Sequence, residues 1–91
     1  MLEREVSASP EEFLRGLRAT FPGRVTEASG GISVDGDGAV MKIALVPGAP
    51  RAIALLRLPT LRVSIRFAAG TPAQQADMLA HMDRAMHRGG G

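Results

Sequence analysis

The sequence predicts an α+β fold with the element order α-β-β-β-β-β-α, in which an antiparallel meander sheet carries both helices on one face. Three observations lead to this prediction. A Ser-Pro helix start lies near the N-terminus, a Thr-Pro helix start lies near the C-terminus, and between them the spacing of apolar residues changes from about 3.6 to about 2. The strands are therefore expected in the middle of the chain.

The first helix is expected over residues 10–21, in the segment SPEEFLRGLRATFPG. Ser9 has the residue type of an N-cap, Pro10 suits the first helical position, and Glu12 is placed to close a capping box. A Pro-Gly pair ends the helix. Its apolar residues fall within one arc and are predicted to enter the core; they are Phe13, Leu14, Leu17 and Phe21.

A first strand is predicted over residues 24–29, joined to the next strand through Gly30 and Gly31. Its register stays open. Glu27 points into the core or away from it, depending on whether the connecting loop has two or three residues.

The segment ISVDGDGAV could begin a calcium loop or form a turn between two strands. A helix-loop-helix calcium site counted from Asp35 needs oxygen ligands at positions now held by Ala39 and Val46. An Asp-Gly pair between apolar alternating segments is a hairpin signal. We therefore predict a turn that keeps Ile32 and Val34 on the same face as Met41.

Three further strands are expected over residues 40–46, 51–58 and 61–67. The first and the last alternate apolar and polar residues, whereas RAIALLRL is apolar on both sides. A four-residue loop at PGAP and a turn at Pro59 and Thr60 place the middle strand between its two neighbours. These registers assign to the core face Met41, Ile43, Leu45, Ala52, Ala54, Leu56, Leu61, Val63, Ile65 and Phe67.

The second helix is expected over residues 72–88, ending at Gly89. Thr71 and Gln74 repeat the capping pattern around Pro72. A methionine stripe at helical spacing is typical of a pliable core, so its predicted core arc is Met78, Leu79, Met82, Ala85 and Met86.

No catalytic or metal constellation emerges from the sequence. The chain has no Cys, which excludes disulfides and thiolate chemistry. His81 follows Asp77, and His87 follows Asp83, by four residues each, and we interpret both pairs as solvated helix-surface contacts. The serines do not stand in a nucleophile pattern. We therefore expect a protein that is not an enzyme and has no metal and no cofactor.

The chain of 91 residues fits one domain, 1–91, with flexible ends at 1–8 and 89–91. It has no apolar run resembling a signal segment or a membrane span, so we expect a cytoplasmic protein that does not associate with membranes. Its charge is uneven. Residues 1–37 hold seven carboxylates against four arginines, whereas residues 38–70 hold five basic residues and no carboxylate.

The outer face of the predicted sheet is the candidate partner-binding surface. The registers place Arg57 opposite Arg62 and combine an apolar patch with a cationic rim, which is typical of an interface. Alternatively, Glu27 or the N-terminal segment lies over this face and neutralises it. The candidate residues are Lys42, Ile53, Leu55, Arg57, Arg62 and Arg66.

The segment RAIALLRLPTLRVSIRFAAG, followed by MLAHMDRAMHRGGG, resembles the C-terminal half of short uncharacterised proteins of Gram-negative bacteria. The shared features are an LPxLxVxIxF strand pair, an Asp-Arg pair in the helix and an RGGG ending, over residues 51–91. The resemblance implies a compact domain of unknown function and transfers no active site.

Two functions compete. A protein-interaction or homodimerisation domain that uses the open sheet face is the leading expectation, because buried interfaces need an apolar centre. The alternative is binding of nucleic acid or another polyanion through the Arg-rich segment 51–66. It is weaker because the predicted face has no aromatic side chain to stack on bases.

Overall fold

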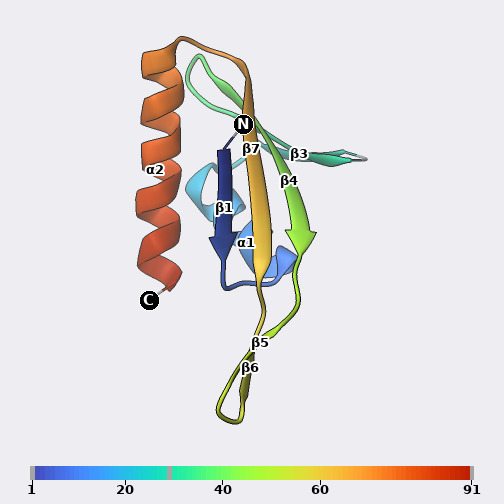
Figure 1. Cartoon of the computed structure of the whole chain (residues 1–91). Coiled ribbons are helices and arrows are strands. Elements are labelled where there is room, and N and C mark those ends of the chain that lie inside the picture. The colour runs from blue at the N-terminus through green and yellow to red at the C-terminus, as the bar shows by residue number, and fades with distance from the viewer. Residues whose placement is uncertain (1, 29, 91) are drawn as a thin grey trace.

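The computed structural model describes residues 2–28 and 30–90, with side chains described through Met86. Its elements are β1 (Leu2–Val6), α1 (Pro10–Thr20), β2 (Val25–Ala28), β3 (Gly31–Asp35), β4 (Val40–Pro47), β5 (Arg51–Ile53), β6 (Leu56–Leu58), β7 (Leu61–Ala69) and α2 (Pro72–Gly90). Figure 1 shows the main sheet with the long helix α2 beside β1 and a narrow ribbon of β5 and β6 that projects from one end.

The main sheet has five antiparallel strands in the order β1-β7-β4-β3-β2. The α+β class, the antiparallel sheet and the two flanking helices are therefore confirmed. Strands β2, β3, β4 and β7 form an antiparallel meander, because each pairs with the next in this series, but the predicted strand between residues 40–46 and 61–67 is absent from it. β1 closes the other edge by pairing with β7.

Both helices begin at the predicted capping boxes. The backbone N–H of Glu12 donates to Ser9 Oγ, and the Ser9 N–H donates to Glu12 Oε1 at 3.0 Å. At the second helix the backbone N–H of Gln74 donates to Thr71 Oγ1 and the Thr71 N–H donates to Gln74 Oε1. Each box satisfies two amides that lack a partner within the helix.

The core lies between one face of the sheet and the two helices. Most of the core residues are every second residue of a strand, because successive side chains of a strand point to opposite faces. The predicted core face of β4 and β7 is therefore confirmed. The buried apolar residues are Phe13, Leu17, Phe21, Ile32, Val34, Ala39, Met41, Ile43, Leu61, Val63, Ile65, Met78 and Met82; among those packed against them are Val6, Leu14, Leu45, Phe67, Leu79 and Met86.

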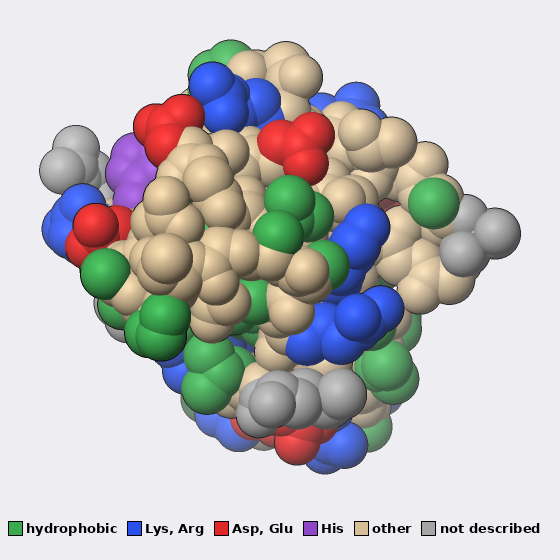
Figure 2. Space-filling model, turned by 90° about the horizontal axis from the view of Figure 1, so that it is seen from above, with side chains coloured by type: hydrophobic (Ala, Val, Ile, Leu, Met, Phe, Trp, Pro, Cys, Tyr) green, Lys and Arg blue, Asp and Glu red, His purple; other side chains and the backbone are tan. Residues whose placement is uncertain are grey.

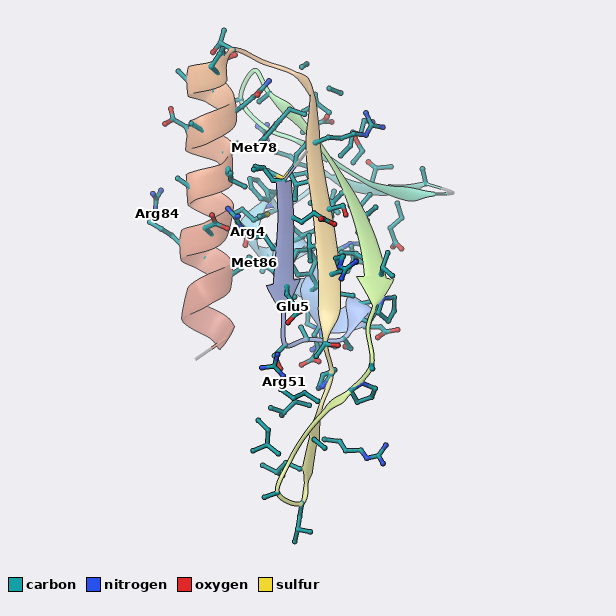
Figure 3. All side chains as sticks on the ribbon, viewed as in Figure 1. Arg4, Glu5, Arg51, Met78, Arg84 and Met86 are labelled. Carbon is teal, nitrogen blue, oxygen red and sulfur yellow. The ribbon has the colours of Figure 1, made fainter. Side chains whose placement is uncertain are left out.

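The second helix buries a narrower stripe than predicted. Met78 and Met82 are buried and Met86 is half-buried, whereas Ala85 is exposed. Figure 3 shows Met78 and Met86 on the side of α2 that faces the sheet. Gly16 of α1 allows the Met86 side chain of α2 to pack closely against α1, because a Cβ at position 16 would lie only 2.9 Å from Met86 Sδ. Residues spaced by four therefore carry the packing, and the prediction for Ala85 is wrong.

The segment between β3 and β4 is a turn, as predicted. The Gly36 N–H donates to Ala39 O at 2.8 Å, and Asp35 pairs with Val40. Ile32 and Val34 lie opposite Ile43 and Met41 on the core face. The turn is thus closed by backbone pairing.

The open register of the first predicted strand is decided by a two-residue connection. Ala28 pairs with Gly31, and Glu27 pairs with Ile32. Glu27 therefore points to the helix side at the sheet edge, where it accepts a hydrogen bond from Arg18 of α1 at 2.8 Å. It does not lie over the opposite face.

The prediction of a sheet strand over residues 51–58 is wrong. β4 pairs directly with β7, so that Met41, Ile43 and Leu45 lie opposite Phe67, Ile65 and Val63. The segment instead folds back on itself as the separate ribbon of β5 and β6. Ala52, Ala54 and Leu56, which were expected in the core, are exposed.

The expectation of a flexible end at residues 1–8 does not hold for Leu2–Val6, which form an edge strand. At the other end, α2 continues to Gly90, two residues beyond the predicted end at residue 88. Of the expected flexible segment 89–91, Gly91 lies outside the described residues. Neither helix, over the described residues, has the length and apolar character needed to cross a bilayer.

Candidate functional site

The structure divides the six candidate partner-binding residues between two places. Lys42, Arg62 and Arg66 lie on the outer face of the main sheet, which is the face opposite to the helices. The others, Ile53, Leu55 and Arg57, lie on the ribbon formed by β5 and β6 or at its turn, hereafter the arm (residues 51–58). The structure therefore offers two separate surfaces where the sequence predicted one.

On the outer face, the cationic residues have neighbours different from those predicted. Lys42 lies directly opposite Arg66, Ala44 opposite Ser64, and Val46 opposite Arg62. Arg57 lies opposite Ala52 in the arm, so the predicted pairing of Arg57 with Arg62 is wrong. The like-charge pair of the sheet is Lys42 with Arg66.

Next to this pair the outer face is hollowed. The hollow has a volume of about 240 Å³, and Lys42 and Arg66 line it together with Ser33 and Ser64. Lys42 Nζ donates to Ser33 Oγ at 3.1 Å. Among its other lining residues are the small residues Ala28, Gly30, Gly31 and Ala44. No described carboxylate lines it.

β1 places two carboxylates on the outer face, and one of them lies opposite Ser64, which lines the hollow. Glu3 lies opposite Ser64 and Glu5 lies opposite Arg62. The N-terminal segment thus places Glu5 next to Arg62 on the outer face, although the Glu5 carboxylate forms its ion pair with Arg51. The structure reaches this result by strand pairing at the sheet edge, not by a segment that covers the face.

The arm continues the hairpin of β4 and β7 beyond the main sheet (Figure 1). Between the two parts, residues 48–50 stand opposite residues 59 and 60, so one side of the hairpin carries an extra residue in a segment that is not a strand. Ile53 pairs with Leu56, and Ala54 and Leu55 make the turn. Ala54 has φ +54°, in the left-handed region that non-glycine residues seldom adopt.

The arm exposes its aliphatic side chains. Leu55 at the turn is fully exposed, Leu56 is 65% exposed and Ile53 is 51% exposed. Arg51 and Arg57 are exposed as well, and the arm contains no carboxylate. Figure 2, which views the molecule from above and so from the end opposite to the arm, shows apolar side chains scattered among charged ones. Of the five large aliphatic residues that are exposed in the described part of the chain, three lie in the arm, and the other two are Leu2 and Val46.

Contacts with the rest of the domain hold the base of the arm. Arg51 Nη2 donates to Glu5 Oε1 at 3.4 Å, and Figure 3 shows these two side chains next to each other where the arm begins. Ser7 Oγ donates to the Pro59 carbonyl at 3.2 Å. Thr60 Oγ1 donates to Ala49 O at 2.7 Å, which ties the two strands together. These contacts fix the base of the arm relative to the rest of the domain, whereas the side chains at its tip do not pack against the core.

A second cleft, lined by both polar and apolar residues, lies where the end of α1 meets α2 and the turn between β3 and β4. Arg24 and Asp37 form an ion pair across it at 3.5 Å. The ring of His81 contacts Phe21 edge-on with 5.3 Å between centroids, and His81 Nε2 lies 3.4 Å from Thr20 O. No three described His, Cys, Asp or Glu side chains are grouped so that they could hold a metal ion.

Of the two Asp-His contacts predicted on α2, only that of His81 falls on described side chains, and among those side chains no hydrogen bond or ion pair joins His81 to Asp77. Asp83 accepts a hydrogen bond from Arg4 of β1 at 3.0 Å. The His87 side chain lies outside the described residues, so its proposed contact with Asp83 is untested. His81 is exposed and turns toward α1, as its contact with Phe21 shows.

Sequence reasoning missed Ser33 and the two glutamates of β1 as parts of the candidate surfaces. Alternation within ISVD places Ser33 on the outer face, but its proximity to Lys42 requires the register of β3 against β4. No family model, curated protein or solved structure matches the chain.

Proposed function

We propose that this chain is a non-enzymatic protein-interaction domain that associates with a second copy of itself through the arm. The single observation that carries this proposal is the exposure of Ile53, Leu55 and Leu56 at the tip of an oriented, carboxylate-free ribbon. The docking element is therefore the arm, in place of the open sheet face that the sequence suggested.

The physical argument begins with the stability of the ribbon. A two-stranded hairpin is marginally stable in water, and a third strand or a packed face stabilises it. The arm has neither within its own chain. Burial of an aliphatic side chain yields roughly 1.5–3 kcal/mol when it is complete. Docking thus stabilises the ribbon and removes exposed apolar surface at the same time.

The charge distribution favours a second copy as the occupant. β1 is an edge strand, so one side of its backbone is free of sheet pairing, and it carries Glu3 on the outer face. Glu3 is exposed and has no ion pair with a described basic residue. Arg57 of the arm is likewise exposed. An arm that adds to the β1 edge of a second copy would bring these opposite charges together, and the exchange is reciprocal in a two-fold dimer.

Sedimentation equilibrium tests the association. The wild-type chain is expected to show a dimer whose fraction rises with concentration, and Leu55→Glu is expected to shift it to the monomer, because a carboxylate would be buried at the contact. Val46→Glu is the matched control. Val46 is 55% exposed on β4, outside the arm, and its substitution should leave the dimer intact. A wild-type chain that stays monomeric up to millimolar concentration contradicts the proposal.

Charge reversal tests the pairing itself. Arg57→Glu and Glu3→Arg should each weaken the dimer when the variant is alone. Mixing the two variants should restore association, because each arm then meets an opposite charge on the other chain. If the mixture associates no better than either variant alone, the arm does not dock on β1 as proposed.

A further inference from the structure

We propose that the hollow on the outer face of the sheet binds the phosphate group of a small phosphorylated compound, held between Lys42 and Arg66. This site is separate from the arm and does not depend on its role. It lies at the opposite end of β4, because Lys42 is near the start of that strand and the arm follows its last residue, Pro47.

The first argument is the unrelieved charge. Lys42 and Arg66 are direct cross-strand neighbours, a placement that destabilises a sheet when both residues carry the same charge. Neither forms an ion pair with a carboxylate in the described part of the chain. An anion seated between them would convert this repulsion into two favourable contacts.

The second argument is the set of donors. The Lys42 ammonium uses one of its N–H groups on Ser33 Oγ and keeps two others, and Ser33, as the acceptor of that bond, keeps its own O–H. Ser64 adds a second hydroxyl to the lining, and Arg66 adds a guanidinium that can bind two oxygens. These groups together suit the three acceptor oxygens and the charge of about −1.5 to −2 of a phosphate monoester better than one carboxylate.

The third argument is the size of the site. Its volume of about 240 Å³ lies below the roughly 300–1,000 Å³ of sites that enclose drug-sized ligands. Ala28, Gly31 and Ala44 leave room for the anion, because none has a long side chain.

The surroundings of the hollow also disfavour a long polyanion. Glu3 and Glu5 of β1 lie on the same face, directly opposite Ser64 and Arg62 of β7, so that a carboxylate borders the hollow on the side of Ser64. They would repel a nucleic-acid backbone that continued from the hollow toward the arm. The positive region is thus local and fits one phosphate group.

Isothermal titration calorimetry with inorganic phosphate and with glycerol phosphate tests the site, against acetate at the same ionic strength. The wild-type chain is expected to bind both phosphates and to bind acetate at least about tenfold more weakly, since the single charge of acetate engages fewer of the donors. Equal response to all three anions overturns the proposal, because it shows general screening.

Three variants locate the binding. Arg66→Gln and Lys42→Gln should each weaken phosphate binding by about tenfold or more, because each removes a charged hydrogen bond to the anion. Arg62→Gln is the matched control on the same strand and face and should change the affinity less than about twofold. An equal loss in Arg62→Gln contradicts the proposed position. Leu55→Glu should retain phosphate binding, which separates this site from dimerisation.

The source of the phosphate is tested in parallel. A short oligonucleotide and vesicles containing phosphatidic acid should bind no more tightly per phosphate group than glycerol phosphate. Tighter binding of the oligonucleotide that requires Arg62 as well as Arg66 would indicate a polyanion track, and tighter binding of the vesicles would indicate a lipid headgroup. Either result overturns the assignment to a small compound.

Discussion

Arg4 of β1 donates a hydrogen bond from Nη2 to Asp83 Oδ2 of α2 at 3.0 Å, and so joins the first strand of the chain to its last helix. Figure 3 shows Arg4 directed toward α2, whereas Arg84, the residue after Asp83, points away from the sheet. The contact is formed because Arg4 shares the helix side of the sheet with Leu2 and Val6. It helps to set α2 beside the edge strand.

Asp83→Asn is expected to lower the free energy of unfolding by no more than about 1 kcal/mol, because both partners are 39% exposed and exposed ion pairs contribute little. Urea denaturation measures the loss, and the difference from wild type should shrink at high salt. Asp77→Asn is the control on the same helix. A loss of several kcal/mol would mean that the pair is needed to dock α2.

Ile65→Glu and Leu55→Glu should have opposite effects on folding. Ile65 is 1% exposed in the core, so a carboxylate there has no partner and should cost more than about 4 kcal/mol, enough to unfold a small domain. Leu55 is fully exposed at the turn of the arm, and its substitution should leave the far-UV circular dichroism unchanged. The reverse pattern would contradict the core assignment of β7.

Replacing either helix cap should weaken the fold. Ser9→Ala and Thr71→Ala remove the side-chain acceptors of the Glu12 and Gln74 amides, and each should cost roughly 0.5–2 kcal/mol in a denaturant titration. Ser9→Asp supplies another acceptor and should retain most of the stability. Equal losses for Asp and Ala at position 9 would show that the cap hydrogen bond is not the cause.

The capping box of α1 should make stability depend on pH. The backbone N–H of Ser9, with its side chain, lowers the pKa of Glu12 below the ordinary value of 4.5. A lowered folded-state pKa means that the stabilisation is complete above 4.5 and is lost as the pH falls through the lower folded-state value. Glu12→Gln should therefore be less stable than wild type at neutral pH, and this difference should shrink in acid. A difference that is constant from about pH 3 to about pH 7 would contradict this linkage.

Ala54→Gly should stabilise the arm. The left-handed conformation at φ +54° costs a residue with a Cβ roughly 1–2 kcal/mol, and glycine avoids that cost although it loses about 0.5–1 kcal/mol through its greater freedom in the unfolded chain. Hydrogen exchange of the arm amides should slow in the variant. Faster exchange would show that the turn does not hold Ala54 in this conformation.

The sequence by itself determined the local features of this protein. Both capping boxes, the turn at Gly36 and the core face of Met41, Ile43, Val63 and Ile65 follow from residue type and spacing, and the structure bears them out. Each depends on contacts within a few residues or on the period of a strand, so the sequence contains the whole signal.

Only the tertiary structure decided which strands pair and where the candidate surfaces lie. The alternation of apolar residues along a strand determines which face of the sheet each side chain is on, but it does not determine which strand is the neighbour. A separate strand at 51–58 with a turn on each side, and a single hairpin with its turn at Ala54 and Leu55, both place the apolar residues of 41–45 and 61–67 on one face. The short, charged strand Leu2–Val6 is selected by the free edge of β7, some sixty residues away, and this selection sets Glu3 and Glu5 on the outer face. The position of Lys42 opposite Arg66 likewise depends on long-range strand pairing. The local pattern of residues around each of them does not specify a partner that is distant in the sequence.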